Sequence, residues 1–274
     1  MAQIKDLSGY LVQTEARGPF DIIGDVHGCF DELHELLQKL GYEVDFDKKE
    51  SRFTVTPPKN HKAVFVGDLV DRGPDSPRVL HLVMDMVEAK QAYCVSGNHD
   101  DKLYRKLVGR NVQVRHGLEL TMEQLSHCST AFVTRVRDFL ANLPHHILLD
   151  EGRLVIAHAG LAEHLHGSHN RSVRDLCLYG PTTGETDQHG LPVRLDWAAN
   201  YTGHAIVVYG HTPVYEPCWR NNTINIDTGC VFGGKLTSLL YPDHILKSVQ
   251  AHKTYAESVR PFLQQNTAIG SVNY

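Results

Sequence analysis

Polar side chains able to bind metal ions follow five apolar runs of the sequence. The segment DIIGDVHG places Asp25 and His27 two residues apart, a spacing that points both side chains to the same side of an extended backbone. Four further runs end in the same way and add Asp68, Asn98, His158 and His211. Carboxylate, amide oxygen and imidazole are ligands of hard to borderline divalent ions, and a bridging carboxylate allows two ions about 3.5–4 Å apart. The pattern therefore predicts a dinuclear metal site.

Each of these residues has an ordinary explanation when it is taken alone. An Asp or Asn after a strand is commonly a turn former or a helix cap, and a single His is commonly a hydrogen-bonded structural group. The metal site is favoured by the joint occurrence of two Asp, one Asn and three His at the ends of five separate segments.

The elements that must position these side chains are short runs rich in Val and Ile. Seven runs are expected to be strands: FDIIGD (20–25), AVFVGD (63–68), AYCVSG (92–97), RLVIAHAG (153–160), AIVVYGH (205–211), TINIDTG (223–229) and LTSLLYP (236–242). Strands that alternate with helices indicate an α/β fold, in which ligands gather at the carboxyl ends of the strands.

Helical periodicity is clear in two segments between these runs. FDELHELLQKLG (30–41) has apolar residues on one face and a terminal glycine, and SPRVLHLVMDMVEAK (76–90) begins with Ser76 as the expected N-cap. The stretches 120–142 and 243–262 show weaker helical character. No repeat or Pro/Gly linker divides the chain, so we expect a single domain over 1–274 with a polar, His-bearing loop insertion at about 161–200.

Composition excludes several classes of protein. A net charge of −5 gives no broad basic surface, so stable binding to nucleic acid is not expected. Six scattered cysteines without a C-x-x-C pair argue against a disulfide framework and against a thiolate zinc site. No apolar run is long enough to cross a bilayer, and MAQIKDLSGYLVQ has no signal-peptide pattern. We expect a cytoplasmic protein without a membrane partner, and its oligomeric state is left open.

Five motifs in order from residue 24 to residue 212 resemble the calcineurin-like metallophosphoesterase family, in its phosphoprotein phosphatase branch: GDVHG, GDLVDRG, GNHD, HAG and GHT. DIIGDVHGCFDEL, RLDWAANY, YGHTPV and TINIDTGCVFGG are similar more narrowly to bacterial stand-alone diadenosine tetraphosphate hydrolases and to the phosphatase module of bacterial polynucleotide kinase-phosphatases. The resemblance spans about residues 19–242. It implies a β-sandwich of two facing mixed sheets flanked by helices.

The resemblance also implies a role for each site residue. Asp25 and His27 would bind one ion, Asn98, His158 and His211 the other, and Asp68 would bridge them. Mn²⁺ is the favoured ion, with Fe, Zn²⁺, Ni²⁺, Co²⁺ and Mg²⁺ as alternatives.

Catalytic roles are implied for three further residues. His99 would donate a proton to the leaving group, Asp71 would orient His99 and keep it protonated, and Arg72 would bind phosphate. Asn98 and His99 would also contact the substrate. Arg194 of PVRLDW is the expected second phosphate-binding arginine, and Asp227 of NIDTG is the expected carboxylate behind the metal ligands.

The activity implied is hydrolysis of phosphoanhydrides in bis(5′-nucleosyl) tetraphosphates by direct attack of a metal-bridging hydroxide. The same site would serve a protein Ser/Thr or Tyr phosphatase or a 2′,3′-phosphatase acting on RNA ends, so the substrate partner is a nucleotide or a phosphorylated protein. A non-catalytic binding scaffold is the remote alternative, because every ligand position is filled. Phosphate-loop, nucleophile-elbow and dinucleotide-binding motifs are absent from the sequence.

Overall fold

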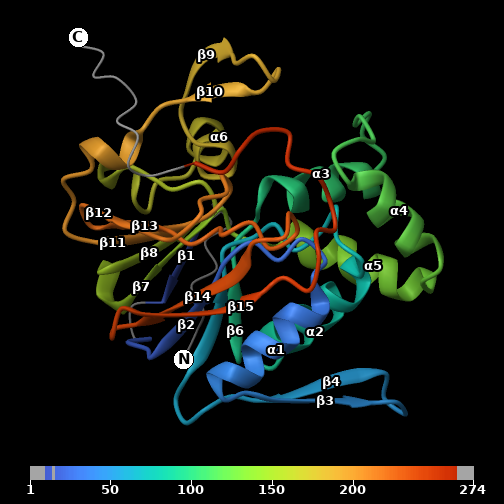
Figure 1. Cartoon of the computed structure of the whole chain (residues 1–274). Helices are drawn as coiled ribbons and strands as arrows, with labels where there is room; N and C mark the ends of the chain where they lie inside the picture. The colour runs from blue at the N-terminus through green and yellow to red at the C-terminus, as the bar shows by residue number, and fades with distance from the viewer. Residues whose placement is uncertain (1–9, 14–15, 264–274) are drawn as a thin grey trace.

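Two β-sheets packed face to face form the centre of the computed structural model, which describes residues 10–13 and 16–263 (Figure 1). The five-stranded sheet has the order β15 (Ile245–Gln250), β14 (Lys235–Tyr241), β2 (Phe20–Ile23), β5 (Lys62–Phe65) and β6 (Ala92–Cys94). The six-stranded sheet has the order β1 (Tyr10–Gln13), β7 (His146–Leu149), β8 (Leu154–Ala157), β11 (Ile206–Tyr209), β13 (Thr223–Asn225) and β12 (Trp219–Arg220). Both sheets contain parallel and antiparallel pairs, which confirms the expected sandwich of mixed sheets.

Alternation of side chains along the strands explains the layers. In β2, Phe20 and Ile22 point into the core between the sheets, where they join Ile156 of the six-stranded sheet. Ile23 of β2 and Phe65 of β5 point to the opposite face of the five-stranded sheet and pack in a second core with the helices. The short apolar runs are therefore buried on both faces, as in parallel strands covered on both sides.

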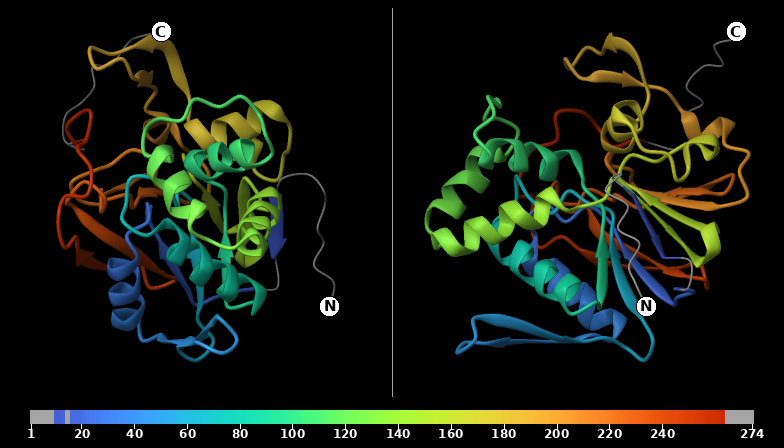
Figure 2. Two further views of the ribbon diagram at one scale, coloured as in Figure 1. Left: turned by 90° about the vertical axis from the view of Figure 1, so that its right-hand side faces the viewer. Right: turned by 180° about the vertical axis from the view of Figure 1, so that it is seen from behind.

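Helices cover the outer face of the five-stranded sheet (Figure 2). They are α1 (Phe30–Leu40), α2 (Ser76–Glu88), α3 (Asn98–Leu107), α4 (Leu118–Ser126) and α5 (Thr130–Ala141), and the hairpin of β3 (Glu43–Asp47) and β4 (Arg52–Thr56) packs against α1 and α2. Among the residues that the structure describes, no helix combines the length and the apolar character needed to cross a lipid bilayer.

Two local expectations are wrong. The stretch 243–262 is not helical: it forms β15 and then irregular backbone, because β15 pairs with β14 from Lys235↔Gln250 to Leu240↔Ile245. The segment 161–200, expected as a loop, contains α6 (Arg171–Tyr179) and a hairpin of β9 (Thr182–Thr186) and β10 (Pro192–Arg194). Helix α6 forms because Val173 and Cys177, four residues apart, pack against Ala157 at the end of β8.

The N-cap of α2 is Asp75 and not Ser76. The Asp75 carboxylate accepts a hydrogen bond from the Arg78 backbone N–H at 3.1 Å. Ser76 is the first helical residue, and its hydroxyl accepts a hydrogen bond from the Asp71 backbone N–H at 3.3 Å. The Ser76 side chain thus stabilises the turn at Asp71, while the Asp75 side chain accepts the hydrogen bond from a backbone N–H of the first helical turn.

Substitution Asp75→Ala is expected to lower the free energy of unfolding by about 1 kcal/mol, because it removes the side-chain acceptor of an unpaired helix N–H. Urea denaturation would measure the change. Lys59→Ala, an exposed loop substitution, is the control and should stay within about 0.5 kcal/mol of the parent. Equal stability of the two variants would show that the cap contributes nothing.

Candidate metal centre

The six predicted metal ligands lie together in the turns that follow five strands. Asp25 and His27 follow β2, Asp68 follows β5, Asn98 follows β6, His158 follows β8 and His211 follows β11. The strands end earlier than the sequence predicts, so these residues occupy turns or, for Asn98, the first position of α3. The carboxyl ends of strands from both sheets meet at this edge, which is why distant segments converge.

Asp68 lies between two groups of candidate ligands. Its Oδ2 atom lies 3.5 Å from His27 Nε2 and 3.4 Å from His158 Nε2. His158 Nε2 in turn lies 3.0 Å from Asn98 Oδ1 and 3.1 Å from His211 Nδ1. The ligand atoms of His27, Asp68 and His99 lie within 4.8 Å of one another, and so do those of Asp68, His158 and His211. Asp68 is shared by both groups, as a bridging carboxylate must be.

Two side-chain atoms of the predicted ligand residues are buried without a hydrogen-bond partner among the described residues. They are Asp25 Oδ1 and His211 Nε2, while Asp25 Oδ2 accepts a hydrogen bond from the His211 backbone N–H at 3.0 Å. Buried polar atoms are normally paired, so the unpaired carboxylate oxygen of Asp25 supports a cation site here. The donor set of carboxylate, amide oxygen and imidazole fits divalent ions such as Mn²⁺, Fe or Zn²⁺.

The buried carboxylates of the centre repel one another and are stabilised by nearby positive charge. Burial, followed by the negative charges of Asp227 and Asp68, raises the pKa of Asp25 well above its usual value. Burial also raises the pKa of Asp227 to about 6 and that of Asp100 to about 7, and Asp68 adds to both shifts. Carboxylates gathered in a site of low dielectric favour bound cations.

The ring orientations of two histidines leave Nε2 available as a ligand atom. His27 Nδ1–H donates to the Val70 carbonyl at 2.8 Å, and His158 Nδ1–H donates to the Val66 carbonyl at 3.0 Å. These bonds fix the tautomer in which Nε2 has the lone pair. Arg72 Nη1 donates to His27 Nε2 at 2.8 Å, so a cation bound to His27 would release the Arg72 guanidinium toward the cavity.

The backbone is strained at the site. Five non-glycine residues have positive φ angles there: His27 (45°), Asp68 (48°), Asp71 (74°), Arg72 (70°) and His211 (74°). Such conformations cost of order 1–3 kcal/mol each and cluster where function requires them. Glycine is required beside two of these turns: a Cβ atom on Gly97 would lie 2.2 Å from Asp68 Oδ1, and one on Gly210 would lie 1.9 Å from Asp25 Oδ1.

His99 and Asp71 form a buried pair beside the metal ligands. His99 Nδ1–H donates to Asp71 Oδ2 at 2.6 Å, and the His99 backbone N–H donates to Asp68 Oδ1 at 2.9 Å. Thr121 of α4 orients Asp71, because its hydroxyl donates to Asp71 Oδ1 at 2.8 Å and accepts from the Asp71 backbone N–H at 3.0 Å. Thr121 is not among the predicted site residues, because it lies 50 residues from Asp71 in a segment without a motif.

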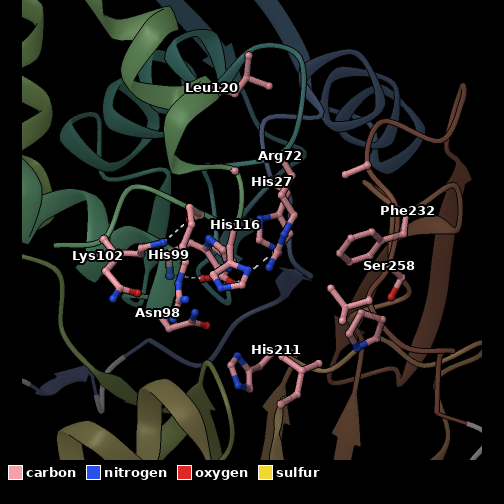
Figure 3. Close-up of a pocket in the computed structure, with 18 of the residues that line it drawn as sticks. His27, Arg72, Asn98, His99, Lys102, His116, Leu120, His211, Phe232 and Ser258 are labelled. Carbon is pink, nitrogen blue, oxygen red and sulfur yellow. Dashed lines mark hydrogen bonds and ion pairs between the residues drawn. The ribbon is translucent and has the colours of Figure 1, made fainter. Parts of the chain in front are cut away.

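A cavity of about 770 Å³ opens over the centre (Figure 3). Eight of the predicted site residues line it: His27, Asp68, Arg72, Asn98, His99, Arg194, His211 and Asp227. Asp25, Asp71 and His158 lie behind this surface, each at most 3% exposed.

Arg194 and Asp227, the two residues carried over from weaker motifs, lie on the wall formed by the insertion and the segment after β13. Arg194 Nη1 donates to the Tyr179 carbonyl, and burial, with the charge of Arg260, lowers the pKa of the guanidinium to about 10. Asp227 Oδ1 accepts a hydrogen bond from the Gly229 backbone N–H at 3.0 Å. Arg194 therefore presents a half-buried cation to the cavity beside His211, whose pKa is lowered by burial and then by Arg194.

Known proteins similar to this chain share its motifs and its fold. The calcineurin-like phosphoesterase family model matches residues 18–215. An Anoxybacillus flavithermus protein named bis(5′-nucleosyl)-tetraphosphatase PrpE [asymmetrical] is 49% identical over 89% of this chain and 99% of its own length. A Bacillus cereus protein of the same name is 44% identical over 88% of this chain and 98% of its own. A solved structure provisionally identified as a diadenosine tetraphosphatase superposes with a TM-score of 0.61 at 26% identity, covering 89% of this chain and 98% of its own. The chain belongs to the calcineurin-like phosphoesterase family.

Proposed function

We propose that this metal-dependent hydrolase cleaves phosphoanhydride bonds of bis(5′-nucleosyl) tetraphosphates at the centre built around Asp68. The observation that supports the reaction is a buried carboxylate shared by two groups of ligand atoms at the floor of an open cavity. The substrate class rests on relatives 44–49% identical over almost their whole length that are named for that activity.

The ligands divide between two ions in the proposed enzyme. Asp25, His27 and Asp68 would hold one ion, and Asp68, Asn98, His158 and His211 the other. When bound, the ions would lower the pKa of a bound water molecule to about 7 and stabilise negative charge on the phosphoryl oxygens. Mn²⁺ is the proposed ion, because the donor set is rich in oxygen and imidazole and contains no thiolate.

Side chains around the ions would bind and protonate the substrate. Arg72, once released from His27, and Arg194 would hold phosphate oxygens, since a guanidinium can bind two oxygens at once. His99 Nε2 is the proposed proton donor to the leaving oxygen, and Asp71 holds the ring through Nδ1. No covalent intermediate is proposed, because a metal-bound hydroxide would attack phosphorus directly.

The remaining expectations stand as proposals of the same kind. We propose that the whole chain acts as one domain and that the 161–200 insertion supplies Arg194 to the cavity wall. A cytoplasmic location fits the six cysteines, all of which are free thiols.

Turnover with Mn²⁺ against a substrate panel tests the proposal. The panel is diadenosine tetraphosphate, phosphoserine and phosphotyrosine peptides, and RNA ends with a 3′-phosphate or a 2′,3′-cyclic phosphate. We expect kcat/KM for the tetraphosphate to exceed kcat/KM for the other substrates by roughly a hundredfold or more. The reason is that polar groups of the cavity that hydrogen-bond to the nucleotide would have no partner when a peptide is bound. Chelation should remove activity on every member.

The products distinguish the remaining alternatives. Chromatography should show nucleoside triphosphate and monophosphate in equal amounts if the cleavage is asymmetrical. Preferential turnover of a phosphopeptide or of an RNA end would replace the proposed substrate while leaving the metal centre in place.

A further inference from the structure

One wall of the cavity has cationic side chains that the metal centre does not use. Lys102 and Arg105 of α3 and Arg115 of the following loop line this wall. Arg105 lies 3.8 Å from the carboxylate of Asp101. In the described part of the chain, Lys102 and Arg115 form no ion pair, and the Lys102 ammonium donates only to the Arg115 backbone carbonyl. These two cations thus form no salt bridge in the described part of the chain, although the carboxylates of Asp71 and Glu119 act on the charge of Lys102 from a greater distance.

These cations lie beside the proposed phosphate-binding arginine. The pKa of His116 is lowered, first by burial and then by the positive charges of Lys102, Arg115 and Arg72. The loop packs directly on Arg72, since a Cβ atom on Gly117 would lie 2.4 Å from the Arg72 backbone nitrogen. Figure 3 shows His116 between Lys102 and Arg72. The positive charge therefore continues from the attacked phosphate along α3.

The facing wall has a different character. Phe232 and Val259 line it, and Figure 3 shows Phe232 across the cavity from Lys102. The Arg72 guanidinium lies 5.3 Å from the centroid of the Phe232 ring. Arg260 of this wall lies 3.4 Å from Asp187 and is neutralised by it. Arg194, on which the charge of Arg260 acts, is the one cation lining this wall that has no ion pair among the described residues. The facing wall thus combines Arg194 with an aromatic ring that suits a base, whereas the α3 wall has two cations that suit a chain of phosphates.

We propose that Lys102 and Arg115 form a polyphosphate subsite that binds the phosphates of the leaving group. This inference rests on the proposed function and makes it more specific. The subsite would select substrates with several consecutive phosphates over phosphomonoesters. It also fixes the direction of the substrate. With the phosphate chain on the α3 wall and a nucleoside on the apolar wall, the attacked phosphorus is the one next to that nucleoside, and a nucleoside triphosphate leaves.

Arg115→Gln is the variant of choice, because Arg115 is exposed and, among residues 10–13 and 16–263, only its backbone takes part in a hydrogen bond. Arg110→Gln is the matched control: it is an exposed arginine of the same loop that does not line the cavity. We expect Arg115→Gln to lower kcat/KM for diadenosine tetraphosphate, mainly through KM, roughly tenfold more than for p-nitrophenyl phosphate. Arg110→Gln should match the parent on both substrates.

Inhibition by inorganic tripolyphosphate tests the subsite without relying on tetraphosphate turnover. With p-nitrophenyl phosphate as substrate and free Mn²⁺ held constant, the parent should bind tripolyphosphate more tightly than orthophosphate. Arg115→Gln should reduce that preference roughly tenfold. Lys102→Gln, which retains a donor for the Arg115 carbonyl, should do the same with an unchanged unfolding midpoint.

The outcomes separate the two proposals. Equal losses on both substrates, with the tripolyphosphate preference retained in Arg115→Gln, would reject the subsite and leave the proposed function intact. A parent that turns over p-nitrophenyl phosphate but not the tetraphosphate would reject the proposed function, and the inhibition ratio would still decide whether the subsite exists.

Discussion

Replacement of Asp68 by alanine is expected to abolish turnover of every substrate, with a loss of about a thousandfold or more. The reason is geometric: Asp68 Oδ2 lies within 3.5 Å of histidines from both ligand groups, so its removal affects both ion positions. Steady-state kinetics on the tetraphosphate and on p-nitrophenyl phosphate would measure the loss. Elemental analysis should find fewer than two ions per chain.

Asp138→Ala is the control for this experiment, because it removes an exposed carboxylate of α5 far from any predicted ligand. Loss of the Asp68 charge relieves repulsion with the buried Asp25, Asp100 and Asp227 but also removes attraction to His27, His99 and His158, so the unfolding midpoint of the variant is measured together with turnover. Substantial turnover by a verified Asp68→Ala protein, or a full complement of two ions, would contradict the bridging role.

His99→Ala is expected to damage hydrolysis of phosphoserine far more than hydrolysis of p-nitrophenyl phosphate. A serine alkoxide is a strong base that needs a proton as it leaves, whereas nitrophenolate and a nucleotide phosphate leave as weak bases. We expect a loss of about 10²–10⁴ in kcat/KM on a phosphoserine peptide and of about tenfold or less on the other two substrates. The comparison uses residual rates at saturating Mn²⁺.

Two further variants make the His99 result specific. Asp71→Asn should reproduce the same order of substrates with smaller losses, because the 2.6 Å hydrogen bond to His99 is weakened while the ring remains. His127→Ala, an exposed histidine at the end of α4, should behave as the parent. Equally large losses of kcat/KM for His99→Ala on all three substrates would contradict the role of His99 as the proton donor to the leaving group.

The convergence of the predicted ligands was predictable because each one directly follows an apolar run. A strand that is buried on both faces has a short apolar sequence rich in Val and Ile, and this pattern is present in β2, β5, β8 and β11. The ends of such strands meet at one edge of a sheet, so the ligand residues could be grouped without coordinates. The strand limits were less accurate, since φ angles in the turns are not encoded by hydrophobicity.

Residues that act through tertiary contacts could not be found in the same way. Lys102 and Arg115 lie outside the motifs, and the packing of α3 and of the following loop beside Arg72 brings them to the cavity. Thr121 is buried behind the cavity, where it contacts Asp71. The helical expectation for 243–262 failed for a related reason. The local secondary-structure propensity of 243–262 gave no information about its pairing with β14. The hydrogen bonds between β14 and β15 make β15 an edge strand.

Asp100 is an intermediate case. It belongs to the GNHD motif, yet the sequence analysis gave it no role. Its carboxylate accepts hydrogen bonds from the Gly97 and Leu69 backbone N–H groups at 2.9 and 3.0 Å, and it thereby ties the Asn98–His99 turn to the Asp68 turn. The acidic residue three positions into a helix that follows glycine was the available signal.

The division of the ligands between two sheets has a consequence for the order of folding. Asp25, His27, Asp68 and Asn98 follow strands of the five-stranded sheet, whereas His158 and His211 follow strands of the six-stranded sheet. Asp25 and His211 are in hydrogen-bonded contact although 186 positions separate them along the chain. Contacts of such long range form late, after the loop-closure entropy has been overcome. We therefore expect a newly made chain to bind cations tightly only after both sheets have formed and packed together.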